Sequence, residues 1–161
     1  MTHISKIAFF LLAFLLLGTL SSCKKSRNEV IPDVYVDFTI DLNDPEFVIL
    51  NTFGENVYVN ENTNNFGSRA AGFARNGIIV HSGVDEFFAY DRTCPHDYAE
   101  NGTIVKVKID PENPLSAICS VCGTQYALPV NGTPADGPGR YPLKNYRTSF
   151  DGRWLRVWNN Y

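Results

Sequence analysis

The chain lacks several features that would assign it to a common functional class. Its formal net charge is −3 and it has no basic patch, so it carries no electrostatic signature of nucleic-acid binding. Its longest apolar run, residues 7–17, covers eleven positions, too few to span a bilayer as a helix. No segment sustains a helical period, although 44% of the residues are hydrophobic. The sequence therefore predicts a folded protein built mainly from β-strands.

Short strands are predicted along most of residues 34–161. Residues 34–42 show the pattern most clearly, because Val36, Phe38 and Ile40 alternate with polar residues, and period two buries one face of a strand. Asp151-Gly152 between two apolar segments is a hairpin signal. The other predicted strands are residues 57–59, 78–81, 87–91, 103–109, 116–119, 146–150 and 154–158, with residues 47–50 as a strand or a single helical turn. This pattern predicts an all-β sandwich or small barrel.

Histidine and cysteine are both scarce, with three histidines and four cysteines in the chain. Three of the cysteines and one histidine fall in two short segments, residues 94–96 and 119–126. Cysteine and histidine hold zinc ions and iron–sulfur clusters. The one-residue gap between Cys94 and His96 predicts that both point the same way from an extended loop. The two-residue gap between Cys119 and Cys122 is usual for a tight turn that presents two sulfurs to one centre. Together these residues predict a four-ligand Cys3His site.

The two segments resemble the signature of Rieske iron–sulfur proteins, a Cys-x-His followed by Cys-x-x-His-Gly-Ser-x-Tyr. Gly123 and Tyr126 match that signature, whereas Cys122 stands in place of its second histidine and Thr124 in place of its serine. The resemblance extends over roughly residues 75–158. It implies an antiparallel β-sandwich with a small inserted β subdomain that carries both ligand loops.

The resemblance also implies the cofactor and the role of each ligand. In Rieske proteins the cysteines bind the inner iron of a [2Fe–2S] cluster and the histidines bind the outer iron. Cys94 and Cys119 are therefore expected on the inner iron, and His96 and Cys122 on the outer one. The implied function is one-electron transfer with an unidentified redox partner protein, which would meet the exposed His96 side. Rieske oxygenases add a large catalytic domain with its own iron site, for which no residues remain here, so an oxygenase is not expected. An electron-transfer or binding protein is expected ahead of a stand-alone enzyme.

Residues around the ligands add to the resemblance. The serine hydroxyl of Rieske proteins bonds to a cluster sulfur and the tyrosine hydroxyl to a ligand cysteine, which implies the same roles for Thr124 and Tyr126. Residues 137–143, which contain Pro138, resemble the Gly-Pro-x-x-x-Pro-Leu segment that covers the cluster in that family. His81 ends an apolar strand and is interpreted as a packed or surface histidine instead of a ligand.

Two alternatives to a cluster remain open from the residues alone. The same Cys3His set would hold one Zn²⁺ in a closed structural site. Without metal, Cys119 and Cys122 would be free or joined in a disulfide, as an oxidising compartment favours. Residues 1–6 lack the arginine pair of the twin-arginine export route, by which exported cluster proteins usually leave the cytoplasm already folded, and this absence favours the alternatives. In either case the protein would be a structural or interaction module.

The N-terminus predicts export and lipid anchoring. Lys6, the apolar run of residues 7–17 and Leu20-Ser21-Ser22-Cys23 resemble the signal peptide and lipobox of bacterial lipoproteins. Residues 1–22 are therefore expected to be a lipoprotein signal peptide. Cys23 would be acylated and, with the polar residues up to 33, would tether a domain of residues 34–161. This predicts a location in the bacterial cell envelope, anchored to a membrane outside the cytoplasm.

Overall fold

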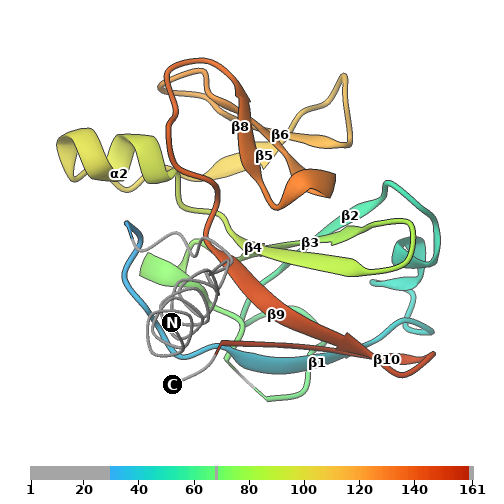
Figure 1. The fold of residues 1–161 in the computed structure, drawn as a ribbon. Helices are drawn as coiled ribbons and strands as arrows, with labels where there is room; N and C mark the ends of the chain where they lie inside the picture. Colours follow the sequence, from blue (N-terminus) through green and yellow to red (C-terminus); the bar gives the residue numbers. More distant parts are fainter. Residues whose placement is uncertain (1–29, 68, 160–161) are drawn as a thin grey trace, which may run out of the picture.

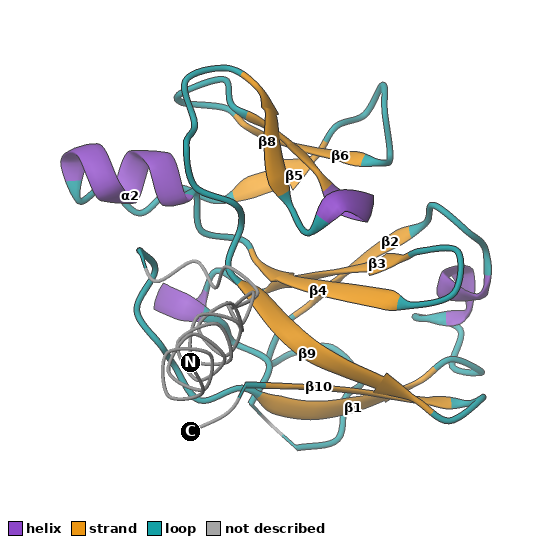
Figure 2. Cartoon of the chain, viewed as in Figure 1, coloured by secondary structure: helices purple, strands orange, loops and turns teal. Residues whose placement is uncertain are grey.

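The computed structural model describes residues 30–67 and 69–159, which are mostly antiparallel β structure (Figure 2). The predicted signal peptide, Cys23 and most of the predicted tether lie outside the described residues. Within the described part of the chain, no helix is long and apolar enough to cross a membrane. The strands are β1 (Asp37–Asp41), β2 (Asn56–Val59), β3 (Ile78–Ser82), β4 (Phe87–Asp91), β5 (Val107–Ile109), β6 (Ser116–Cys119), β7 (Gln125–Ala127), β8 (Thr133–Asp136), β9 (Asn145–Phe150) and β10 (Trp154–Trp158).

The strands form two antiparallel sheets. The larger sheet has the order β1-β10-β9-β4-β3-β2, and the smaller has the order β5-β6-β7-β8. All four strands of the smaller sheet lie between β4 and β9 in the chain, so the small sheet is an insertion in the large one (Figure 1). The all-β fold with a small inserted β subdomain, expected from the sequence, is confirmed.

The large sheet curls around its own apolar core. In β1, Phe38 and Ile40 are buried, and they lie opposite Val157 and Leu155 of β10. These side chains share one cluster with Val80 and other buried residues of β2, β3 and β4. The polar residues between them in β1 are only half-buried, which is the alternation that the sequence predicts. Burial of this one face fixes the register of β1 on β10.

A second apolar core joins the small sheet to the outer face of the large one. Ile79 and Tyr90 contribute to it from β3 and β4, on the side opposite the first core. Tyr126 and two cysteines, Cys94 and Cys119, contribute to it from the inserted segment. Residues of β3 therefore pack alternately into one core and the other, and all five are buried. The cysteines belong to the packing that holds the two sheets together.

The segment that follows Cys94 is a helix, so the extended loop that the sequence predicted is wrong. Helix α2 (Pro95–Asn101) begins at a proline, which lacks an N–H and has a fixed φ suited to the first helical position. It ends at Gly102, whose φ of 65° is a left-handed conformation that favours glycine. At seven residues, with only Pro95 and Asp97 buried, the helix is too short and too exposed to show a helical period.

Residues 30–67 and 69–159 also contain three short 3-10 helices. They are η2 (Val48–Asn51), η3 (Phe73–Arg75) and η4 (Leu128–Val130). Of the two predictions for residues 47–50, the helical turn is the one observed. Strands β7 and β8 were not predicted, because both are short and β8 contains a proline.

His81 is a packed histidine, as the sequence predicts. Its ring is buried on β3, and Nδ1 lies 2.8 Å from the side-chain oxygen of Asn56, to which it donates a hydrogen bond. Nε2 is buried with no hydrogen-bond partner among the described residues. Burial lowers the pKa of His81 from 6.5 to about 4, because the imidazolium form would lose its hydration.

We expect this buried histidine to make the fold acid-sensitive. Between pH 6.5 and 4 the unfolded chain binds a proton at His81 and the folded chain does not, so stability present above pH 6.5 is lost as the pH falls. The free energy of unfolding, measured with urea, should be about 1–2 kcal/mol lower at pH 5 than at pH 7. His81→Gln, which does not titrate, should flatten this dependence. An unchanged slope in that variant would assign the acid sensitivity to other groups.

Candidate metal centre

Two local structures place the three cysteines. Cys94 is the residue before helix α2, and its carbonyl accepts the hydrogen bond of Tyr98 N–H, 3.2 Å. Cys119 ends β6, and Cys122 lies in the turn to β7. That turn is closed by two backbone hydrogen bonds, from Gly123 N–H to the carbonyl of Cys119 and from Cys119 N–H to the carbonyl of Thr124, each 2.9 Å. Both cysteines of the turn are thereby held at one end of the small sheet.

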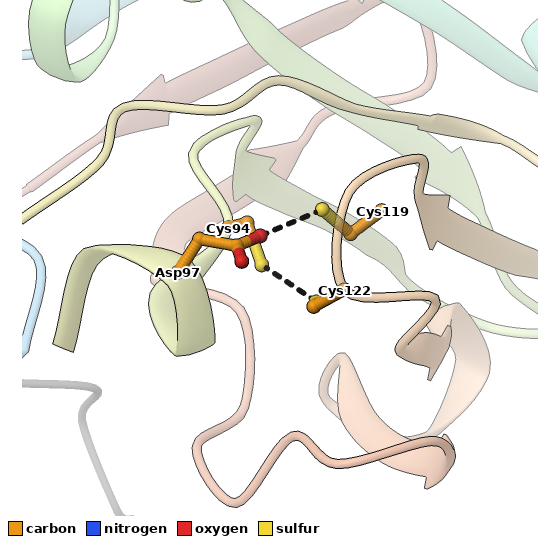
Figure 3. A group of neighbouring side chains, drawn as sticks. All are labelled: Cys94, Asp97, Cys119 and Cys122. Atoms are coloured by element: carbon orange, nitrogen blue, oxygen red, sulfur yellow. Dashed lines mark hydrogen bonds between the residues drawn. The ribbon is translucent and has the colours of Figure 1, made fainter. Parts of the chain in front are cut away.

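The structure brings three of the four predicted ligands together and adds a residue that sequence reasoning missed. The sulfurs of Cys94, Cys119 and Cys122 and a carboxylate oxygen of Asp97 all lie within 4.8 Å of one another (Figure 3). The Cys94 and Cys122 sulfurs are 3.7 Å apart, and the Cys119 thiol donates a hydrogen bond of 2.9 Å to Asp97 Oδ2. Cys94, Cys119 and Asp97 are buried, and Cys122 is half-buried. All three cysteines are free thiols, with no disulfide within residues 30–67 and 69–159.

His96, the fourth predicted ligand, lies outside this group of four side chains. Its Nδ1 is nevertheless buried and has no hydrogen-bond partner in the described part of the chain. Helical geometry explains why Asp97 joins the group in place of His96, since residues three apart share a helix face and residues two apart do not. Asp97, three residues after Cys94, therefore reaches the sulfurs. The sequence signal that would have found it is Pro95, which marks a helix start one residue after Cys94.

Two hydroxyl groups lie beside cysteine sulfurs. The Tyr126 hydroxyl lies 3.3 Å from Cys94 Sγ, and the Thr124 hydroxyl accepts a hydrogen bond of 3.2 Å from the Cys122 thiol. Gly139 N–H donates to the same Thr124 oxygen, 3.0 Å. Because that oxygen already accepts from Gly139, its own proton is available to a deprotonated Cys122 sulfur. Both hydroxyls are thus placed to stabilise thiolates.

The residue 137–139 loop packs against Thr124 so closely that it requires glycine. A Cβ at Gly137 would lie 2.8 Å from Thr124 Cα, and one at Gly139 would lie 2.9 Å from Thr124 Oγ1. Gly137 also has a φ of 83°, a left-handed conformation. Pro138, between the two glycines, is exposed. The loop therefore packs directly on Thr124, whose hydroxyl contacts Cys122.

The electrostatics of the centre are those of a pocket that needs a cation. Burial raises the pKa of Cys94 well above its usual range, and burial together with the hydrogen bond to Asp97 raises that of Cys119 to about 11. Burial alone would also raise the pKa of Asp97, but hydrogen bonds from the cysteine thiols, led by Cys119, hold it below its usual value. Without a positive charge beside them, the Cys94 and Cys119 thiols therefore stay protonated at neutral pH. A bound metal ion supplies that charge and displaces the thiol protons.

The residues present fit a metal or an iron–sulfur cluster. Three sulfurs gather at one pocket, and a buried imidazole nitrogen without a partner comes from the same segment. Sulfur and imidazole nitrogen are the ligand types of zinc and of Rieske clusters. The Tyr126 hydroxyl beside Cys94 supplies the outer hydrogen bonding that such ligands usually have. The arrangement is a candidate metal centre.

No protein-family model matches the chain, and no curated protein matches it. Among solved structures, the chain is similar to the ferredoxin of carbazole 1,9a-dioxygenase from Nocardioides aromaticivorans IC177. The TM-score is 0.46 and the sequence identity 13%, over 80% of this chain and 100% of the ferredoxin. The all-β fold described above rests on the chain's own strands and their pairing.

We expect the Thr124 hydroxyl to hold the loop of residues 137–139 in place. Thr124→Val keeps the side-chain shape but removes the acceptor of Gly139 N–H, so the unfolding free energy should fall by about 1–3 kcal/mol. Amide hydrogen exchange should then be faster at Gly139. Thr124→Ser is the matched control, because it loses a methyl group but keeps the hydroxyl, and Gly139 should stay protected. Equal exchange at Gly139 in both variants would contradict this role.

Proposed function

We propose that this protein transfers single electrons through a [2Fe–2S] cluster held by Cys94, Cys119, Cys122 and His96. The observation that carries the proposal is the pair of hydroxyls that contact the sulfurs, Tyr126 at Cys94 and Thr124 at Cys122. Hydrogen bonds to sulfur help to set the reduction potential of an iron–sulfur cluster, so these contacts suit a redox centre. The buried Nδ1 of His96 without a partner supports a ligand role for that residue.

The chain's own residues would hold the cluster and define its exposed end. A [2Fe–2S] cluster takes up and releases one electron at a potential set by its ligands and surroundings. Cys94 and Cys119 are fully buried, which suits the inner iron. Cys122 is half-buried between exposed Val121 and Gly123, so its end of the centre is nearest to solvent. A one-electron donor or acceptor protein would approach there.

The proposed anchor would hold this centre near a membrane. Cys23 ends a segment that resembles the lipobox of bacterial lipoproteins, and acyl chains on that residue would hold the domain at the cell envelope. The described domain begins a few residues later: Lys144, buried beside β9, donates a hydrogen bond of 2.8 Å to the carbonyl of Ile31 and forms an ion pair with Asp33. These contacts tie the end of the predicted tether to the domain.

The test of the proposed function is cluster assembly in the absence of oxygen. The full-length protein, supplied with iron and sulfide, should gain visible absorption, and one-electron reduction should produce a paramagnetic signal. His96→Gln should lose the cluster or hold it weakly. Asp97→Asn is the matched control at the next position and should retain it. Wild-type protein that stays colourless after this treatment would exclude electron transfer by a cluster.

We expect Cys122→His to raise the reduction potential. The substitution restores the two-histidine ligand set and replaces a negative thiolate with a neutral imidazole, so the reduced centre carries less negative charge. The potential should rise by on the order of 100 mV and become pH-dependent where the new imidazole titrates. Spectroelectrochemical titration across pH measures both effects. A potential that is unchanged or lower would show that Cys122 is not an iron ligand.

We expect Cys23→Ala to release the protein from membranes. The apolar run of residues 7–17 is too short to hold the protein by itself, so membrane attachment would depend on acylation of Cys23. Fractionation of cells that express each form measures the distribution. Cys122→Ala serves as the control for loss of a cysteine elsewhere. Equal membrane retention of Cys23→Ala and wild type would contradict lipid anchoring.

A further inference from the structure

We propose that the same pocket binds a single zinc-type divalent ion through Cys94, Cys119, Cys122 and Asp97, with Asp97 as the fourth ligand in place of His96. This proposal goes beyond the cluster and does not depend on it. The two ligand sets share three sulfurs and differ in the fourth ligand. Asp97 is the residue that the Rieske resemblance leaves without a role.

The distances in the pocket are those of a one-ion site. A tetrahedral zinc ion with Zn–S bonds of about 2.3 Å holds its sulfurs about 3.8 Å apart. The Cys94 and Cys122 sulfurs lie 3.7 Å apart, and all four donor atoms lie within 4.8 Å of one another. A two-iron centre divides its ligands between two metals, and ligands on different irons are farther apart than ligands on one. The four donor atoms are therefore close enough together to bind one ion.

Asp97 is placed as a ligand by its burial and by its partner. Its side chain is 3% exposed, and its Oδ2 atom accepts a hydrogen bond from the Cys119 thiol, so it faces the pocket instead of solvent. Carboxylate oxygen is an ordinary zinc ligand. A helix start at Pro95 fixes the side chain there, because Cys94 and Asp97 are three residues apart. Exposed carboxylates that gather by chance have neither the burial nor the thiol contacts.

Binding would exchange protons for metal without any change of oxidation state. The thiols of Cys94, Cys119 and Cys122 each release a proton to solvent, and the divalent ion takes their place among three thiolates and one carboxylate. The net charge of the loaded site is then −2. The hydroxyls of Tyr126 and Thr124, which already contact two of the sulfurs, are placed to donate hydrogen bonds to the thiolates. Zinc and cluster would exclude each other, because both need all three cysteines.

The experiment uses Co²⁺ as a spectroscopic probe of the full-length, metal-free protein, followed by displacement with Zn²⁺. Wild type should bind one ion with thiolate charge-transfer bands and the absorption of tetrahedral cobalt. Asp97→Asn should weaken binding at least about tenfold, and Asp97→Cys, which offers a fourth thiolate, should restore it. His96→Gln should bind as wild type does. Circular dichroism of each metal-free variant verifies the fold. If Asp97→Asn does not fold, cobalt binding by Asp97→Cys and His96→Gln shows whether Asp97 or His96 is the fourth ligand.

Two results would overturn the proposal. One is wild-type protein that binds no cobalt at the thiols. The other is loss of binding in His96→Gln while Asp97→Asn binds as wild type, which would make His96 the fourth ligand. Different results would refute the proposed function and this inference. A protein that binds cobalt through Asp97 but assembles no cluster refutes electron transfer alone. A protein that assembles a cluster but binds no cobalt refutes this inference alone.

Discussion

The burial of the Cys94 and Cys119 thiols at the junction of two sheets is the constraint on which the centre depends. Cys94 and Cys119 are part of the apolar core that joins the small sheet to β3 and β4. In that environment a thiolate is unfavourable unless a positive charge lies beside it. The same packing that assembles the domain therefore leaves the Cys94 and Cys119 thiols protonated beside the Asp97 carboxylate, a group of side chains suited to a metal ion. A metal ion bound by these two residues would therefore also strengthen the attachment of the small sheet.

The position of Pro95 decides which side chains reach that pocket. A helix start one residue after Cys94 places Asp97 beside the sulfurs and leaves His96 outside the group. His96 Nδ1 remains buried without a partner among the described residues. The segment thus offers two fourth ligands, one neutral and one negative, to the same three cysteines. Which ligand is used would depend on whether the occupant has one metal or two.

The sequence predicted the parts of the fold that follow from local patterns. Alternation in residues 34–42 predicted the buried face of β1, and the cysteine spacings predicted that separate segments meet at one centre. Helix α2 was not predicted, because its two turns bury only Pro95 and Asp97. Hydrophobic periodicity, the main sequence signal of a helix, is therefore missing. Strand β7 depends on pairing with β6 and β8 more than on its own three residues. The role of Asp97 could not be predicted, because it depends on that helix.

Cys94, Cys119 and Cys122 are proposed to hold metal together in the native protein. The direct measurement is the metal and acid-labile sulfide content of full-length protein purified without oxygen and without added metal, compared with a variant in which all three cysteines are serine. The account predicts one metal centre per wild-type chain and none in the variant. With sulfide, that centre is a cluster, and without sulfide it is a single ion. Folded wild-type protein that contains no more metal than the serine variant would contradict the claim.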